Sequence, residues 1–219
     1  LVLCASVGTE AEEVNALVDA GIPVTLICRD VTGVRAPVVR GDDFLGGLML
    51  TRHLIGQGHR RIAMVGGRRA TSAGRERNLG WKQALGEAGI DAAGQVDIPE
   101  LMTQADGRDV VPTLLAADPR PSAVFAFNDL VAYGILSALR RHGVEPGPGM
   151  ALGGYDDTDG ADSRLPSLTS VWNAPEVIGA RAASLILRQI GGERVTDEHI
   201  LIPPELRIRE STPPPPPES

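Results

Sequence analysis

The sequence predicts an α/β protein in which mostly parallel strands form doubly wound sheets with helices on both faces. Short apolar runs of strand length alternate with longer amphipathic stretches along nearly the whole chain. This alternation is typical of strands joined by crossover helices. Aromatic residues make up only 3% of the 219 residues, so Leu, Val, Ile and Ala must fill the core.

The first part of the chain predicts three strands and two helices. The expected strands are residues 1–5, 23–28 and 36–39, and the expected helices are 10–20 and 43–56. Each helix has a capping candidate: Thr9 before the first, and Asp42 or Asp43 before the second. Three strands are few for an independent sheet.

The rest of the chain predicts a longer series of the same units. The expected strands are 61–66, 96–98, 122–127, 150–154, 168–172, 199–202 and 205–208, and the expected helices are 75–88, 107–117, 129–142 and 175–190. Pro175 suits the first turn of its helix, because a helix start needs no backbone donor there. The consecutive prolines 213–217 are expected to form an extended, solvated tail.

Polar side chains follow two of these strands directly. Asn128 and Asp129 come after strand 122–127, and Asp129 is well placed to cap the next helix. Asp156 comes just after strand 150–154. Adjacent parallel strands would bring Asn128 and Asp156 to one sheet edge, where open α/β sheets bind ligands.

Composition and motifs argue against several other classes of protein. The net charge of −7 gives no electrostatic footprint for nucleic acid, and no apolar run reaches the roughly 18 residues that span a bilayer. Cys4 and Cys28 are expected to be buried, reduced thiols, because two cysteines make no disulfide framework or metal site. The four histidines lack metal-ligand spacing, and no dinucleotide, P-loop or nucleophile-elbow motif is present. We therefore expect no cofactor, no metal and no catalysis.

Several segments together resemble the effector-binding core of LacI-type (LacI/GalR) bacterial transcription regulators. In chain order they read GHRRIAMVGG (58–67), RERNLGW (75–81), AVFAFNDLVAYGILSALRRHG (123–143), GGYDD (153–157) and PSLTSVWNAPEVIGARAASLIL (166–187), followed by LRIREST (206–212). The match covers residues 1–212, and five pieces in this order and spacing are far more specific than any one of them.

The resemblance implies a two-lobed, periplasmic-binding-protein-like (type I) fold. The expected division is an incomplete N-terminal lobe of residues 1–57 plus 173–196, a C-terminal lobe of 58–172 plus 197–211, and a Pro-rich tail of 212–219. The family's usual chain also has a helix-turn-helix headpiece, a hinge helix and further strand–helix units ahead of residue 1. The resemblance implies a cytoplasmic homodimer that binds a small-molecule effector, without membrane contact, and meets operator DNA only through that headpiece.

The family pattern also suggests ligand-binding residues. The strongest candidates are Asp156, Asn128 and Arg77, the second arginine of the R-x-R-x-x-G segment. A carboxylate, an amide and a guanidinium fork suit a ligand rich in hydroxyls. The weaker candidates are Arg29 from the other lobe, with Met102, Trp172 and Phe127 as apolar or stacking surface.

Each candidate has a structural alternative, and so does the function. Asp156 and Asn128 could be turn residues, Arg77 an exposed helix arginine, and Trp172 a core residue. A sugar or polyol is expected as effector, because a purine usually wants more stacking surface. The alternative function is a periplasmic sugar-binding protein of a transporter, and a nucleotide-using α/β enzyme is a more distant one.

Overall fold

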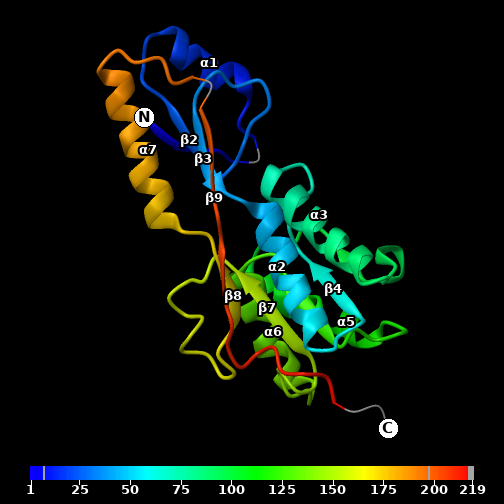
Figure 1. The fold of residues 1–219 in the computed structure, drawn as a ribbon. Helices are drawn as coiled ribbons and strands as arrows, with labels where there is room; N and C mark the ends of the chain where they lie inside the picture. Colours follow the sequence, from blue (N-terminus) through cyan, green and yellow to red (C-terminus); the bar gives the residue numbers. More distant parts are fainter. Residues whose placement is uncertain (7, 197, 217–219) are drawn as a thin grey trace.

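The computed structural model describes residues 1–6, 8–196 and 198–216, and within them the strands form two separate sheets (Figure 1). The first sheet has the order β1 (Val2–Cys4), β2 (Thr25–Ile27), β3 (Val38–Gly41) and β9 (His199–Ile202). The second has the order β10 (Glu205–Arg207), β8 (Thr169–Trp172), β7 (Ala151–Tyr155), β6 (Ala123–Ala126), β4 (Ile62–Val65) and β5 (Asp97–Ile98). Among these strands only the β10–β8 pairing is antiparallel. The predicted two-lobed, mostly parallel α/β fold is confirmed.

Helices cover the faces of both sheets. The first sheet carries α1 (Ala11–Asp19) and α7 (Pro175–Ile190), and the second carries α2 (Asp43–Gly56), α3 (Ser72–Glu87), α4 (Gln104–Asp109), α5 (Val111–Ala116) and α6 (Asp129–Arg141). The predicted helix 107–117 is two short helices instead. Pro112, near the start of α5, has no backbone N–H to donate to the preceding turn. Because that hydrogen bond is missing, α4 does not continue into α5. Within the described parts of the chain no helix is long and apolar enough to cross a bilayer.

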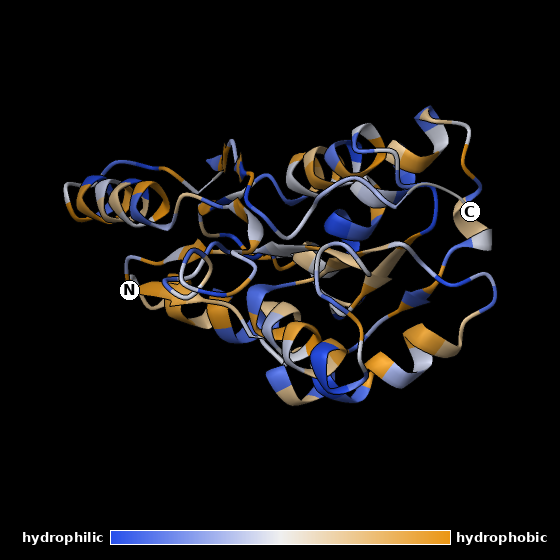
Figure 2. Ribbon diagram, turned by 90° about the horizontal axis from the view of Figure 1, so that it is seen from below, coloured by the Kyte–Doolittle hydropathy of each residue, from blue (hydrophilic) through white to orange (hydrophobic). Residues whose placement is uncertain are grey.

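The central strands of the second sheet are buried on both faces. On one face Val65, Val124 and Leu152 pack beneath α6. On the other, Met64 and Phe125 pack with the residues of α2 and α3. Alternating side chains of one strand therefore enter opposite cores, as in sheets covered on both sides. Figure 2 shows that the helices covering the sheets carry both apolar and polar residues, as expected for helices with one buried and one exposed face.

Two of the predicted lobe boundaries are wrong. Helix α2 was expected in the first lobe, yet its Leu50 and Leu54 pack with Trp81 and Phe125 of the second lobe. Strand β9 was expected in the second lobe, yet it pairs with β3 in the first sheet. Hydrophobic periodicity reveals which face of an element is buried, but it does not reveal which sheet covers that face.

The chain therefore crosses between the lobes at three places: directly after β3, between β8 and α7, and between β9 and β10. Only the second crossing lies where the sequence predicted it, near residue 172. The predicted boundary at Asp197 lies outside the described residues.

The C-terminal segment lies against the second lobe and is not a free tail over its described length. Thr212 is buried, and its hydroxyl is hydrogen-bonded to Thr169 and to His53. The carbonyl of Pro213 lies 2.9 Å from Nε2 of His59. The predicted tail boundary at residue 212 is therefore too early, and residues 217–219 lie outside the described part of the chain.

Helices α2 and α3 approach each other closely because glycines occupy their contact. A Cβ on Gly80 would lie 2.3 Å from the carbonyl oxygen of Phe44, and a Cβ on Gly47 would lie 2.4 Å from the carbonyl oxygen of Arg77. No side chain fits at those distances. The close contact brings Asp43, at the start of α2, beside Arg77 on α3.

We predict that Gly80→Ala lowers the free energy of unfolding by about 1–3 kcal/mol, because the added methyl group overpacks the contact. Urea denaturation measures this change. Gly86→Ala is the matched control in the same helix, since a Cβ there meets no atom within 4 Å. This control should be stabilising by about 0.5–1 kcal/mol through helix propensity. Equal effects of the two substitutions would contradict the close contact.

Candidate ligand-binding cleft

A cavity of about 200 Å³ lies between the two lobes, at the carboxyl ends of strands from both sheets. The first lobe and the second crossing contribute Cys4, Cys28, Arg29, Gly41, Asn173 and Ile178, and the second lobe contributes Asp43, Ala73, Arg77, Met102, Phe127, Asn128 and Asp156. Six of the seven candidate residues from the sequence therefore meet at one cavity. The exception is Trp172.

A second hollow, of about 320 Å³, lies elsewhere on the second lobe. Its lining includes Arg60, Arg61 and Arg120, close to the amino ends of β4 and β6. It is larger, but residues of one lobe alone line it. The cleft is the better candidate for a ligand site, because side chains from both lobes and a carboxyl group with a raised pKa converge there.

Arg77 lies in the wall of the cleft with its guanidinium held by the protein. Nε donates to Oδ1 of Asp43 at 2.7 Å, and Nη1 donates to the carbonyl of Phe127 at 2.7 Å. The guanidinium carbon lies 3.4 Å from the ring centroid of Tyr155. Only 6% of Arg77 is exposed, so it is no surface helix arginine. Much of its donor capacity is already used within the protein.

Asp156 faces the cleft beside this group. Its Oδ1 lies 3.6 Å from Nη2 of Arg77 and accepts a hydrogen bond of 3.3 Å from Nδ2 of Asn173. About a third of its side chain (36%) remains exposed. The backbone at Asp156 has φ of +98°, a left-handed conformation that is uncommon outside glycine. Such strained positions cluster at ligand sites.

The electrostatic surroundings of Asp156 favour its neutral form. Burial raises the pKa of Asp156 to about 6, and the nearby carboxylates of Asp129 and Asp43 act in the same direction. Arg77 and Arg29 oppose the shift without cancelling it. The ionised carboxylate is therefore under-compensated, and a ligand that donates hydrogen bonds to it would relieve this.

Asn128 supplies the helix cap that the sequence assigned to Asp129, and it also lines the cavity as predicted. Asn128 has the extended backbone of an N-cap, and its Oδ1 accepts from the backbone N–H of Val131 at 2.9 Å. Asp129 is the first helical residue and cannot cap, so the prediction that it caps α6 is wrong. Asn128 also donates to the carbonyl of Met102 at 3.2 Å while lining the cavity.

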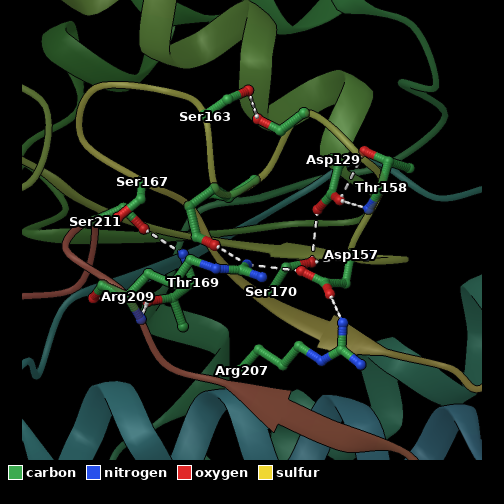
Figure 3. A network of polar contacts seen from close by, with 12 residues as sticks. Asp129, Asp157, Thr158, Ser163, Ser167, Thr169, Ser170, Arg207, Arg209 and Ser211 are labelled. Carbon is green, nitrogen blue, oxygen red and sulfur yellow. Dashed lines mark hydrogen bonds and ion pairs between the residues drawn. The ribbon is translucent and has the colours of Figure 1, made fainter.

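Asp129 instead anchors the loop that follows β7 (Figure 3). It is fully buried, accepts a 2.7 Å hydrogen bond from the Ser170 hydroxyl, and accepts another of 2.7 Å from the backbone of Thr158. Asp157 is held in the same network by ion pairs to Arg207 and Arg209. These contacts fix the loop directly after Asp156.

The remaining candidates divide between cleft and core. Met102, Phe127 and Arg29 line the cavity. Trp172 is absent from the lining; it packs against the first-lobe core, and the guanidinium of Arg207 lies over its ring at 4.8 Å. The predicted ligand contact of Trp172 is therefore not supported, and the alternative of a packing role fits.

Sequence reasoning missed several residues of the cleft. The sequence predicted Asp43 only as a possible helix cap, but its side chain is buried (3% exposed) and forms an ion pair with Arg77. Cys4 and Cys28 were expected to be buried, yet both are exposed at strand ends of the first sheet. Asp156 was identified because it follows the carboxyl end of a parallel strand, and both cysteines lie at such strand ends as well. Within the described residues no group of three or more His, Cys, Asp or Glu side chains could hold a metal ion.

We predict that Arg77→Leu lowers the free energy of unfolding by about 3–5 kcal/mol, because it leaves the buried Asp43 carboxylate without its partner. The double variant Arg77→Leu/Asp43→Asn should lose less than Arg77→Leu alone, since it removes the uncompensated charge. Urea denaturation of the two single variants and the double variant measures the coupling. A double variant at least as unstable as the sum of the singles would contradict this account.

Comparison of sequences places these features in a family. Residues 51–212 match the family described as periplasmic binding protein-like domain. The chain is 32% identical over 193 residues to the transcriptional regulator DegA of Bacillus subtilis, covering 88% of this chain and 57% of DegA. It is 34% identical over 170 residues to the regulator CelR of Thermobifida fusca, covering 78% of this chain and 50% of CelR. The chain thus spans between half and three fifths of these curated relatives.

Solved structures agree with the sequence comparison. A LacI family regulator from Enterococcus faecium with bound ribose superposes with a TM-score of 0.90 at 26% identity, covering 97% of this chain and 79% of that one. The CelR–cellobiose complex superposes with a TM-score of 0.82 at 33% identity, covering 89% and 60%. The chain belongs to the periplasmic binding protein-like domain family, in the form that makes up the effector-binding core of LacI-type transcriptional regulators.

Proposed function

We propose that this chain is the ligand-sensing core of a cytoplasmic transcription regulator and binds a sugar or sugar-like polyol in its cleft. The observation that carries the proposal is the under-compensated Asp156 carboxylate in a cavity lined by both lobes. A carboxylate can accept hydrogen bonds from two neighbouring hydroxyl groups, the arrangement that sugars offer. The relatives crystallised with ribose and with cellobiose support the same class of ligand.

The other polar groups of the cleft suit this ligand. Among the described residues the Arg29 side chain makes no hydrogen bond or ion pair, so its guanidinium is available to hydroxyl oxygens from the first-lobe side. Met102 and Phe127 supply apolar surface for a sugar face. Arg77 acts mainly by holding Asp156 and Phe127 in place, because its own donors are largely engaged.

Ligand binding is proposed to act through the angle between the lobes. A ligand that contacts Arg29 on one lobe and Asp156 on the other stabilises a closed arrangement, provided that it binds this arrangement more tightly than an open one. The lobe angle would then set the spacing of helix-turn-helix headpieces in a homodimer, with operator DNA contacted by those headpieces and not by these 219 residues. The regulators among the relatives favour this function over a transporter's binding protein, and the proposal involves no catalysis.

We predict that Asp156→Asn weakens binding of the effector by about 10- to 100-fold, the loss expected for a hydrogen bond to a charged acceptor. A thermal-shift screen of sugars and nucleosides, with ribose and cellobiose included, identifies the ligand because binding to the native state raises the melting temperature. Calorimetry then measures both affinities. Asp162→Asn, an exposed residue of the following loop, is the matched control and should bind normally. Unchanged affinity of Asp156→Asn would overturn the site.

The pKa of about 6 for Asp156 gives two pH effects of opposite direction. Ligand affinity should fall about tenfold between pH 7 and pH 5, because only about a tenth of the carboxyl groups are ionised one unit below the pKa. The contribution of Asp156 to the stability of the free protein should instead rise between pH 7 and pH 5. The native state binds more protons than the unfolded state between pH 4 and 6, so this group's contribution to the unfolding free energy falls as pH rises through that interval. Asp156→Asn should remove both dependences, and calorimetry and urea denaturation across this pH range test them.

A further inference from the structure

The two cysteines of the chain lie next to each other in the first-lobe wall of the cleft. Strands β1 and β2 are parallel neighbours, with Cys4 in register with Ile27, the residue before Cys28. Both cysteines are free, and both residues line the ligand cavity. Neither is used by the proposed ligand contacts.

The backbone at Cys28 explains how two residues on a diagonal come together. In a regular strand successive side chains point to opposite faces. Strand β2 ends at Ile27, and Cys28 adopts a left-handed conformation with φ of +68°, which interrupts this alternation. The register of β1 and β2 places the two residues one step apart on neighbouring strands, and both side chains line the same cavity. Neighbouring strands lie about 4.8 Å apart and rise about 3.3 Å per residue, so Cα atoms one residue out of register lie about 6 Å apart, within the range that a disulfide spans.

We propose that Cys4 and Cys28 form a reversible disulfide across the wall of the ligand cleft. The oxidant is a small-molecule disulfide of the glutathione class. One cysteine thiolate attacks the reagent, its S–S bond breaks, and the first small thiol leaves. The second cysteine then attacks the mixed disulfide and displaces the other small thiol. The two protons lost by the cysteines pass to the two leaving thiolates, so the reagent gains the two electrons that the protein loses.

The surroundings of the two thiols set the order of these steps. Withdrawal from bulk water raises the pKa of Cys28 to about 12, with Cys4, Asp156 and Asp43 contributing in the same direction. The thiolate is the attacking species, so Cys28 reacts slowly with a reagent from solution. Cys4 is therefore the attacking thiol, and Cys28 resolves the mixed disulfide, to which proximity brings it.

Formation of this disulfide would change ligand binding if the proposed function holds, on which this step rests. The new bond joins the ends of β1 and β2, and Arg29 follows Cys28 directly. Arg29 is the cation that faces Asp156 from the first lobe. A disulfide at Cys28 would restrict the movement of Arg29 and of the strand ends on the first-lobe side of the cleft. These residues could then adjust less to a ligand, so we expect the oxidised protein to bind more weakly.

The disulfide itself is tested by mass spectrometry of the intact chain after incubation in glutathione redox buffers and acid quenching. The wild type should lose two hydrogen atoms, regain them with dithiothreitol, and give a single peptide pair that joins Cys4 to Cys28. Cys28→Ser should instead gain one glutathione, and it should gain it faster than Cys4→Ser. Wild-type chains with two glutathione adducts, or unmodified wild type where the single variants react, would overturn the disulfide. Faster reaction of Cys4→Ser would overturn the order of steps.

The effect on ligand binding needs a separate measurement. Calorimetry with ribose and with cellobiose compares reduced and oxidised wild type, and the Cys4→Ser/Cys28→Ser double variant is the control that oxidation should leave unchanged. We expect at least a threefold weaker affinity after oxidation. Equal affinities would overturn redox control of the cleft. A reduced protein that binds neither these sugars nor any member of the screened library would count against the proposed function, while the mass spectra still decide the disulfide.

Discussion

The buried guanidinium of Arg77 is the group on which the geometry of the cleft depends. Its partners come from different parts of the second lobe: Asp43 from the start of α2, the Phe127 carbonyl from the end of β6, and Asp156 from the end of β7. A charge withdrawn from water must find such partners, so its burial ties these elements together. The glycine contact between α2 and α3 allows this, because a bulkier residue at Gly80 would separate Asp43 from Arg77.

One guanidinium compensates two carboxylates unequally, and the proposed function depends on this inequality. Asp43 receives the short, well-aligned hydrogen bond, whereas Asp156 lies 3.6 Å away and keeps a raised pKa. The protein thus tolerates an ionised carboxylate that it stabilises incompletely in the absence of a ligand. Hydroxyl groups of a ligand would supply the missing donors. Under the proposed function, the same feature that costs the free protein stability would give the cleft its affinity for hydrogen-bond donors.

The sequence predicted the architecture and the edge of the site, because both depend on local patterns. Apolar runs identified the strands, and polar residues directly after them identified Asn128 and Asp156 at one sheet edge. Assigning elements to lobes failed for α2 and β9, since an amphipathic pattern is the same whichever sheet covers it. The partners of Arg77 and the packing of Trp172 against the first-lobe core arise from tertiary contacts that no local sequence pattern predicts.

At two strand ends beside the cleft, one residue lines the cavity and the next residue is held by contacts within the protein. Asn128 lines the cavity while Asp129 is buried and holds the loop of Thr158, and Asp156 faces the cavity while Asp157 is held by two arginines. At Asp156, Asp157 and Cys28 the backbone is left-handed, so the direction of the side chains departs from strand alternation. The position of polar residues at strand ends thus identified the cavity side chains, but it assigned the cap of α6 to Asp129 when Asn128 supplies it. In the first lobe both consecutive residues, Cys28 and Arg29, line the cavity, so a bond at Cys28 would restrict the cation that the proposed ligand contacts.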